Sequence, residues 1–376
     1  METFKISMVA PSRIGKTSLV TAILSDVQDL LSGTPITIKA KDPKTNSRIN
    51  QHKSELNGSL RAGEFESGAM SGTQEAFEFN LLLKNINNDN NDLTLNFLDF
   101  PGGWMSNIQT EDAIDDHAKC AKFIQESSVL IVVVDASIIM EAASPSQKRA
   151  IDTILEVPAT QDIVRSWAKE RAKNRIDPAL LLICPVKCES YFSDNGGHKD
   201  RSDALYRSVV EDVYQKLLPI VNEEANQTEI LYMPVDTVGC VEFISANWGE
   251  EKNNPIFSPH FKVRGNSKIS VKGADDVLVA IAKQLIRAQE GIKKACAKDF
   301  SLKAADATKK AIEDKAWYQK VATTIFNYET DAEEKAKHLS VKARIAASEA
   351  LSVGEFLGVL AKHPFGPRVR HIRQEQ

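Results

Sequence analysis

The stretch VAPSRIGKTSLVTAIL, residues 9–24, decides the fold, and it follows a short apolar segment near the start of the chain. An apolar strand, a tight turn and then Gly15, Lys16 and Thr17 at the start of a helix give the pattern G-x-x-x-x-G-K-[ST] of a phosphate-binding loop. The first glycine of that pattern is Ala10 here, which is tolerable because the position needs only a small residue in a sharp turn. We therefore expect a phosphate-binding loop between the first strand and the first helix.

Each residue of this loop has an expected task. Backbone N–H groups of the loop and of the helix N-terminus hold phosphates, Lys16 neutralises the β- and γ-oxygens, and the Thr17 hydroxyl coordinates Mg²⁺. Arg13 is a candidate catalytic residue together with Lys16, because it can reach charge that develops on the γ-phosphate; a solvated charge or a salt bridge is the alternative. The residues expected to contact the nucleotide here are Ser12, Arg13, Ile14, Gly15, Lys16, Thr17 and Ser18.

A second motif lies in LTLNFLDFPGGWM, residues 93–105, where Asp99 ends an apolar strand and Gly102 completes D-x-P-G. The Asp99 carboxylate is placed to hold the hydration shell of Mg²⁺, and the Gly102 N–H is free to meet a γ-phosphate. An ordinary Asp-Phe-Pro-Gly turn is the alternative. The position on the next sheet strand after a phosphate loop favours the metal-binding interpretation.

Together these motifs resemble the translation-factor-related class of P-loop GTPases, which contains the Ras-like proteins. In that class a switch-I threonine precedes the second strand, and Thr73 takes this place. The resemblance implies that Thr73 binds Mg²⁺ and the γ-phosphate only while the triphosphate is intact, whereas a hydroxyl that caps the strand entrance is the alternative. Within the class, SRIGKT followed by DFPGGW is similar to the bacterial YcjX-like and double-GTPase-type families. The resemblance implies GTP or GDP and Mg²⁺ as cofactors.

The base-recognition motif of the class, [NT]-K-x-D, reads Val186, Lys187, Cys188 and Glu189 in this chain. The resemblance implies that Lys187 lies against the base plane and that Glu189 accepts the two guanine N–H groups. Val186 cannot supply the usual asparagine contact, which weakens guanine selectivity. A strand exit with solvated Lys and Glu is the alternative.

A last base-side loop is expected after the sixth strand, and two stretches compete for it. Strand order favours YMPVDTVG, with Asp236 and Thr237, because it follows the strand directly. Residue identity favours FISANWG, because its Ser245 and Ala246 resemble the SA motif of the class. The sequence leaves both open.

Hydrolysis requires a group that orients the attacking water, and Ras-like enzymes use the residue that follows DxxG. That residue is Gly103, which has no side chain. Either another group orients the water, or hydrolysis is slow without a partner; the candidates are Gln74, Gln109 and Glu111. We therefore expect a GTP-binding switch with low intrinsic activity. The alternatives are a nucleotide-binding interaction module without useful turnover and an ATP-using P-loop enzyme.

Short apolar runs alternate with helical stretches over residues 1–295, which predicts an α/β three-layer sandwich of the P-loop NTPase type. We expect six strands, mostly parallel with one antiparallel edge strand, and a long polar loop over residues 32–72 as an enlarged switch I. The expected strands are 4–9, 77–83, 93–99, 129–135, 180–185 and 230–235, and the expected helices 16–31, 112–126, 146–174, 202–222 and 274–295. Residues 296–376 are expected to form a C-terminal helical module with a solvated basic tail that carries Arg368, Arg370 and Arg373.

The chain has 376 residues, a net charge of −4 and 42% hydrophobic residues, which predicts a globular protein. No concentrated basic face is evident, so we expect no nucleic acid partner. A signal peptide and a run of about 18 apolar residues are not found, so we expect a cytoplasmic protein without a transmembrane segment. The expected partners are a guanine nucleotide and a protein effector or partner GTPase, and oligomers are possible.

Overall fold

The computed structural model describes residues 2–66, 76–86, 88–100, 111–173, 179–251, 254–265, 268–288, 290 and 357–373. Its main sheet has eight strands in the order β11-β8-β7-β6-β1-β5-β4-β2, of which the five from β8 to β5 are parallel. The strands are β1 Glu2–Val9, β2 Ile36–Ala40, β4 Phe77–Asn85, β5 Asn88–Asp99, β6 Val129–Asp135, β7 Leu180–Val186, β8 Glu229–Tyr232 and β11 Arg370–Arg373. The expected α/β fold with a mostly parallel sheet is confirmed.

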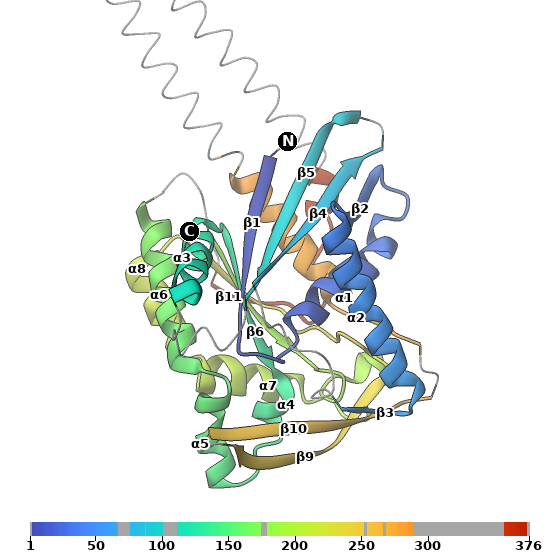
Figure 1. The fold of residues 1–376 in the computed structure, drawn as a ribbon, viewed down its shortest axis with the longest axis vertical. Helices are drawn as coiled ribbons and strands as arrows, with labels where there is room; N and C mark the ends of the chain where they lie inside the picture. Colours follow the sequence, from blue (N-terminus) through green and yellow to red (C-terminus); the bar gives the residue numbers. More distant parts are fainter. Residues whose placement is uncertain are drawn as a thin grey trace, which may run out of the picture.

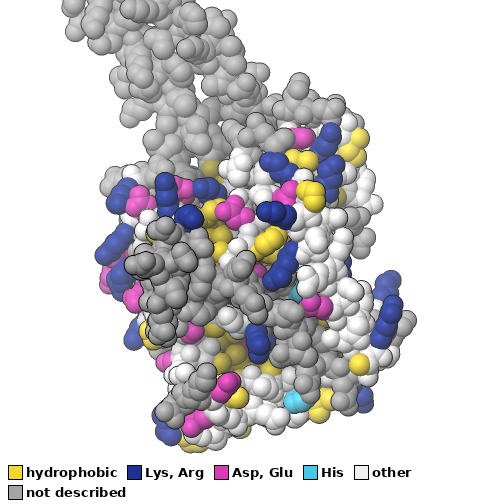
Figure 2. Space-filling view, in the orientation of Figure 1, with side chains coloured by type: hydrophobic (Ala, Val, Ile, Leu, Met, Phe, Trp, Pro, Cys, Tyr) yellow, Lys and Arg dark blue, Asp and Glu magenta, His cyan; other side chains and the backbone are white. Residues whose placement is uncertain are grey.

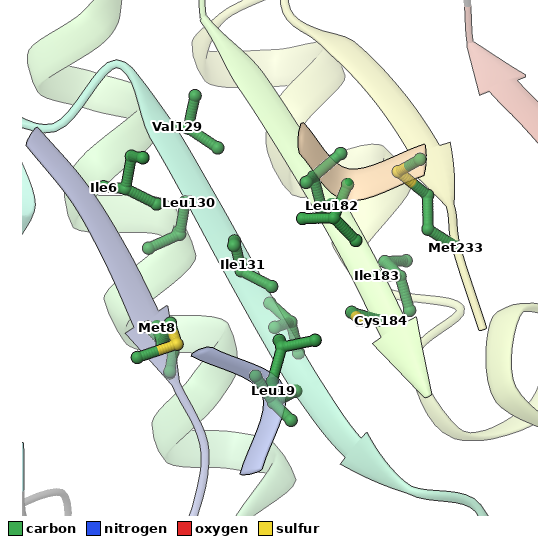
Figure 3. Packing of buried hydrophobic residues seen from close by; sticks show 14 of the residues in the cluster. Ile6, Met8, Leu19, Val129, Leu130, Ile131, Leu182, Ile183, Cys184 and Met233 are labelled. Atoms are coloured by element: carbon green, nitrogen blue, oxygen red, sulfur yellow. The ribbon is translucent and has the colours of Figure 1, made fainter. Parts of the chain in front are cut away.

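Continuous apolar runs form the central strands β6 and β7, and every residue of both is buried. Such runs arise because helices cover both faces of a parallel sheet, so neither face meets water. Figure 3 shows Ile131 of β6, Leu182 of β7, Met8 of β1 and Leu19 of α1 within one buried cluster. The phosphate loop therefore starts from the most deeply packed part of the fold.

Helices lie on both sides of the main sheet (Figure 1). In that view α3, α6 and α8 lie on one side of the strands, and α1 and α2 lie on the other. The helices are α1 Lys16–Leu31, α2 Pro43–Arg61, α3 Glu111–Glu126, α4 Ala136–Met140, α5 Pro145–Ile154, α6 Val157–Lys173, α7 Ser202–Tyr206 and α8 Leu217–Glu224, with a further helix over residues 274–288. Helix, sheet and helix form the three layers that the sequence predicts.

The prediction of six strands with one antiparallel edge strand is wrong in both numbers. β2 and β11 are additional strands, and β4, β2 and β11 are all antiparallel to their neighbours. β2 has five residues inside a polar segment, and β11 has the sequence RHIR. β2, with the sequence ITIKA, does carry a strand signal in its β-branched residues and its alternating burial, and this signal was overlooked inside a polar segment, whereas β11 has only one apolar residue.

The prediction that residues 32–72 form one long polar loop is also wrong. The segment contains β2, the 19-residue helix α2 and β3 Glu64–Glu66. α2 begins where the Asp42 side chain accepts a hydrogen bond from the N–H of Thr45, with Pro43 at the first helical position. Both features are strong helix-start signals. The buried residues of α2 are Thr45, Ile49, Leu56 and Leu60.

β3 belongs to a second sheet of order β3-β10-β9, with β9 Val241–Glu251 and β10 Asn254–Val263. Ser245 and Ala246 lie within β9, where Ser245 pairs with His260. They are therefore strand residues of the second sheet and form no loop at the end of the main sheet. Of the two candidates for the last base-side loop, the structure leaves Asp236 and Thr237, in the segment that follows β8.

Two long helices expected from the sequence are each interrupted. Residues 146–174 contain α5 and α6, which are separated at Glu156, whose φ is +46°. Pro158 lies in the first turn of α6 and is a sequence signal for a helix start. Residues 202–222 contain α7, a π-helical segment Arg207–Val213 and most of α8.

The division into residues 1–295 and a helical module 296–376 needs a correction at its C-terminal end. β11 pairs with β8, so the end of the chain adds a strand to the main sheet. Residues 291–356 lie outside the described part, and the helical module stays a prediction for them. Among the helices that the structure describes, none combines the length and the apolar character that crossing a membrane requires.

Candidate functional site

The loop between β1 and α1 has the backbone conformation of an anion site. Arg13 and Gly15 have φ angles of +63° and +128°, both in the left-handed region. Changes between right- and left-handed conformations turn successive backbone N–H groups toward one concave side, where they can bind an anion. Ser12 and Arg13 are exposed on this loop, while Ile14 is buried beneath it. The geometry therefore supports phosphate binding at the place that the sequence predicts.

Gly15 lies against Val186 at the end of β7. A Cβ atom at position 15 would be 3.3 Å from Cγ2 of Val186, and a φ of +128° strains any residue with a side chain. The valine at the place of the usual asparagine thus packs on the phosphate loop. Both the close approach and the backbone conformation require glycine at position 15.

The Lys16 side chain is buried inside the phosphate loop and is 4% exposed. Its Nζ donates hydrogen bonds to the carbonyl oxygens of Ala10 and Pro11, at 2.9 and 3.0 Å, and lies 3.9 Å from Oδ1 of Asp99. Burial lowers the pKa of Lys16, and the charge of Asp99 acts in the opposite direction. A lysine held at the loop in this way is placed to bind a phosphate that the same loop binds.

Thr17 and Asp99 bring two oxygen atoms together at the ends of α1 and β5. Thr17 Oγ1 donates to Asp99 Oδ2 at 2.7 Å, and Asp99 is fully buried. Hydroxyl and carboxylate oxygens suit Mg²⁺, which uses one or two protein ligands and takes the others from water and phosphate. The described residues contain no group of three His, Cys, Asp or Glu that could hold a metal ion alone. The oxygens present therefore fit a nucleotide-bound Mg²⁺.

α2 places His52 beside the phosphate loop. Its Nε2 is 3.1 Å from Oγ of Ser18, and burial lowers the pKa of His52. Sequence reasoning assigned no role to His52, because it stands alone in the sequence without the Cys or acidic residue that a nucleophile arrangement needs. The helix-start signals at Asp42 and Pro43 are what could have identified α2 and the residues on it.

Lys187 connects the base side to the phosphate loop. It follows β7 with a φ of +57°, and its Nζ donates to Asp135 Oδ2 at 2.5 Å and to the Arg13 carbonyl oxygen at 3.4 Å. Sequence reasoning missed Asp135. The signal was available, because an acidic residue at the carboxyl end of a central parallel strand lies where open α/β sheets bind ligands.

Glu189 is buried behind the last base-side loop and is 1% exposed. Its Oε1 accepts hydrogen bonds from the N–H groups of Val238 and Gly239, at 3.0 and 3.2 Å. Burial, and then the charge of Asp236, raise the pKa of Glu189 to about 7. The alternative of a solvated Lys and Glu at a strand exit is therefore excluded for Glu189. Among the described residues, its Oε2 has no hydrogen-bond partner.

Asp236 and Thr237 are both buried in the loop after β8. Oδ2 of Asp236 accepts hydrogen bonds from Nδ2 of Asn195, at 2.9 Å, and from Nη2 of Arg368, at 2.8 Å. Asp236 is thus held by protein groups, and its charge acts on Glu189. The structure brings Glu189, Asp236 and Thr237 together at one end of the main sheet.

The prediction of a solvated basic tail is wrong for Arg368, which is 6% exposed and pairs with Asp194 and Asp236. Arg370 donates to Asp203, and Arg373 donates to the carbonyl oxygens at the end of α8. The arginines are held because β11 joins the sheet and carries them to acidic and carbonyl partners.

Several predicted residues lie outside the described part of the chain. They are Thr73, Gln74, Gly102, Gly103 and Gln109, together with the side chain of Glu111. Their roles in binding Mg²⁺, the γ-phosphate or the attacking water stay predictions.

No protein-family model matches the sequence, and no curated protein matches it. Among solved structures, the chain is similar to Era in complex with MgGDPNP and nucleotides 1506–1542 of 16S ribosomal RNA, at 14% identity over 63% of this chain and 52% of that chain, with a TM-score of 0.28. It is also similar to an Aquifex aeolicus Era variant bound to GDP and AlF₄⁻, at 14% identity over the same shares, with a TM-score of 0.25. This chain spans about half the length of each Era chain. The likeness to YcjX-like proteins stays a prediction.

The expectation of no nucleic acid partner needs a correction: it rests on net charge alone, and the Era chain of the first comparison is itself in complex with RNA. Net charge describes a whole chain, whereas phosphates are bound by local groups of Lys and Arg. On the face shown in Figure 2, Lys and Arg side chains are interspersed with Asp and Glu. A net charge of −4 therefore does not exclude RNA.

Proposed function

We propose that this protein is a Mg²⁺-dependent GTP-binding switch that hydrolyses GTP slowly or when a partner stimulates it. The observation that carries the proposal is the contact of Thr17 Oγ1 with Asp99 at 2.7 Å, beside the buried Nζ of Lys16. It joins a phosphate loop to a carboxylate on a neighbouring parallel strand. An effector or a partner GTPase would respond to the bound nucleotide.

At the phosphate end, backbone N–H groups of residues 12–18 bind the phosphates, and Lys16 turns from the loop carbonyls to the β- and γ-oxygens. Thr17 and Asp99 would hold Mg²⁺ directly or through water. The metal would supply positive charge that offsets the charge of the phosphates. Thr73 is the proposed further ligand of Mg²⁺ and of the γ-phosphate.

At the base end, Lys187 lies beside the phosphate loop through its contact with the Arg13 carbonyl oxygen, so its aliphatic stem is placed to cover a base plane. Glu189 is the proposed acceptor for guanine N–H groups. Its Oε1 already accepts from the amides of Val238 and Gly239, so its Oε2 is the oxygen proposed to accept from the base. Because Glu189 is buried, this role requires the loop after β8 to move on binding.

A second candidate is an ATP-using P-loop enzyme. Val186 replaces the usual asparagine, and the protein's own backbone already occupies one oxygen of Glu189. Both observations favour weaker guanine selectivity than the resemblance implies.

The deciding experiment is to identify and quantify the nucleotide that copurifies with the protein, followed by calorimetric titration with GDP, a non-hydrolysable GTP analogue and ATP in the presence of Mg²⁺. We expect guanine nucleotides to copurify and to bind more tightly than ATP. Lys16→Ala and Thr17→Ala should abolish or greatly weaken Mg²⁺-dependent binding, because they remove phosphate charge compensation and a metal ligand. Lys148→Ala, on the exposed surface of α5, is the matched control.

Circular dichroism of each variant shows whether the fold is retained. Unchanged nucleotide affinity in both folded loop variants would contradict the phosphate-loop assignment. Tight binding of ATP with no preference for GTP would replace the GTP-binding switch with the second candidate.

A further inference from the structure

The C-terminal segment, residues 357–373, returns to the base side of the candidate nucleotide site. Its strand β11 pairs with β8, which leads into the loop that contains Asp236. The segment is also fixed to the helix over residues 274–288, because the N–H of Gly366 donates to Oδ1 of Asp276 at 2.7 Å. A Cβ atom at Gly366 would be 2.8 Å from Asp276 Oδ2, so a larger residue here would displace the Asp276 carboxylate. The chain is therefore anchored on both sides of Arg368.

Arg368 is the residue of this segment that reaches the base-side loop. Its Nε donates to Asp194 Oδ2 at 3.0 Å, and its Nη2 donates to Oδ1 of Asp194 and, at 2.8 Å, to Oδ2 of Asp236. The guanidinium lies 4.0 Å from the ring centre of Phe192. One planar group thus makes a two-pronged ion pair, a second ion pair and a stacking contact, a combination that an ammonium group cannot reproduce.

The contacts of Arg368 continue to Glu189 through the loop after β8. Asp236 lies in this loop, two residues before Val238, and the N–H groups of Val238 and Gly239 bind Oε1 of Glu189. Asp236 and Glu189 are both buried carboxyl groups, so they disfavour each other's charge unless a cation compensates it. Arg368 provides a cation at Asp236.

We propose that Arg368 is a positioning residue for base recognition: through Asp236 and Asp194 it anchors the loop after β8, whose Val238 and Gly239 amides hold Glu189, and so limits how far this loop moves when a base binds. The inference rests on the proposed function, because it requires that this loop contacts a nucleotide base. It makes the C-terminal segment part of the nucleotide site, although 132 residues separate Arg368 from Asp236 in the chain.

The test compares GDP and ADP binding by full-length Arg368→Met, Arg368→Lys and Asp194→Asn proteins with binding by the wild type. Calorimetry is carried out at a temperature well below the melting temperature of every variant. Arg373→Ala is the matched control, because Arg373 lies on the same strand but donates to the carbonyl oxygens of Ala225 and Thr228, at the opposite end of β8. Affinity for Mg²⁺ and pyrophosphate reports on the phosphate end alone.

We expect Arg368→Met to lower GDP affinity at least tenfold and to reduce the ratio of GDP to ADP affinity, with pyrophosphate affinity unchanged. Arg368→Lys should lower GDP affinity and the affinity ratio less than Arg368→Met does. Asp194→Asn should have an effect on the ratio between those of Arg368→Met and the wild type. It also tests the inference if Arg368→Met does not fold. Arg373→Ala should lower the melting temperature without changing the affinity ratio. A ratio equal to that of the wild type in folded Arg368 and Asp194 variants would overturn the inference. Absence of guanine nucleotide binding by the wild type would overturn the proposed function and the inference with it.

Discussion

Replacing Glu189 by glutamine should remove a pH dependence from the stability of the protein. Burial, and then the charge of Asp236, raise the pKa of Glu189 in the folded protein from 4.5 to about 7. The folded state therefore holds a proton that the unfolded state releases between these pH values. Stability from this group is fully present below pH 4.5 and is lost as the pH rises to about 7.

The magnitude follows from the interval between the two pKa values. At about 1.4 kcal/mol per pH unit, the interval of about 2.5 units between 4.5 and 7 corresponds to a loss of about 3.5 kcal/mol in the free energy of unfolding. A glutamine side chain at this position would keep an oxygen acceptor for the N–H groups of Val238 and Gly239 but has no proton to lose. The Glu189→Gln variant should therefore gain stability relative to the wild type as the pH rises from 5 to 8, by about 3 kcal/mol in all.

Urea unfolding at pH 5, 6, 7 and 8, followed by the fluorescence of the buried Trp167, measures this difference. Titrating groups that do not interact with Glu189 contribute equally to both proteins and cancel when the variant is compared with the wild type at each pH, so the difference reports on Glu189 together with its neighbour Asp236. Glu250→Gln, at an exposed glutamate of β9, is the matched control and should follow the wild type. Parallel pH profiles for wild type and Glu189→Gln would refute the reasoning.

Four further outcomes follow from the site. Gly15→Ala should weaken nucleotide binding at least about tenfold, because φ is +128° and the new methyl group meets Val186 at 3.3 Å. Calorimetry checks it, with Lys148→Ala, on the exposed surface of α5, as the control. GTP should compete at least about tenfold better than ATP, because adenine leaves the buried Glu189 carboxylate without a donor, at a cost of about 1–3 kcal/mol. In a competition assay, Glu189→Ala should remove this preference. Partner-free turnover in a phosphate-release assay should stay below about 1 s⁻¹, because Gly103 has no side chain to orient water. The amides of α2 should be equally protected from hydrogen exchange with GDP and with a GTP analogue, because its buried face already packs; a large difference would show that this helix is part of the switch.

The helices and strands that the sequence predicts correctly are those whose boundaries are set by neighbouring residues in the chain. The helix α1, Lys16–Leu31, and the strand β6, Val129–Asp135, begin and end at the predicted residues. α1 starts at the lysine of the phosphate loop, and β6 is one apolar run that ends at an acidic residue. In both cases a few adjacent residues carry the boundary, so reading along the chain is sufficient.

The elements that the sequence misses depend on contacts between distant segments. α2 has four buried residues among nineteen, so its helical period is hidden in a polar segment, although Asp42 and Pro43 mark its start. β11 forms a strand because β8 pairs with it, Asp203 accepts from Arg370, and the carbonyl oxygens of Ala225 and Thr228 accept from Arg373. Ile372 is the one apolar residue in the sequence RHIR, which is too few to indicate a buried strand.

The two ends of the candidate site differ in the same way, and this difference explains why one was predicted in more detail than the other. The phosphate end is formed by one loop and Asp99, on a strand that pairs with β1, so its contacts are encoded within two short motifs. The base end is assembled from the segments after β7 and β8 and from the C-terminal residues, and Arg368 completes it from beyond residues 291–356. Lys187 joins the two ends by its contact with the Arg13 carbonyl oxygen. The contacts of the proposed phosphate end are therefore encoded locally, whereas those of the proposed base end depend on how distant parts of the chain pack.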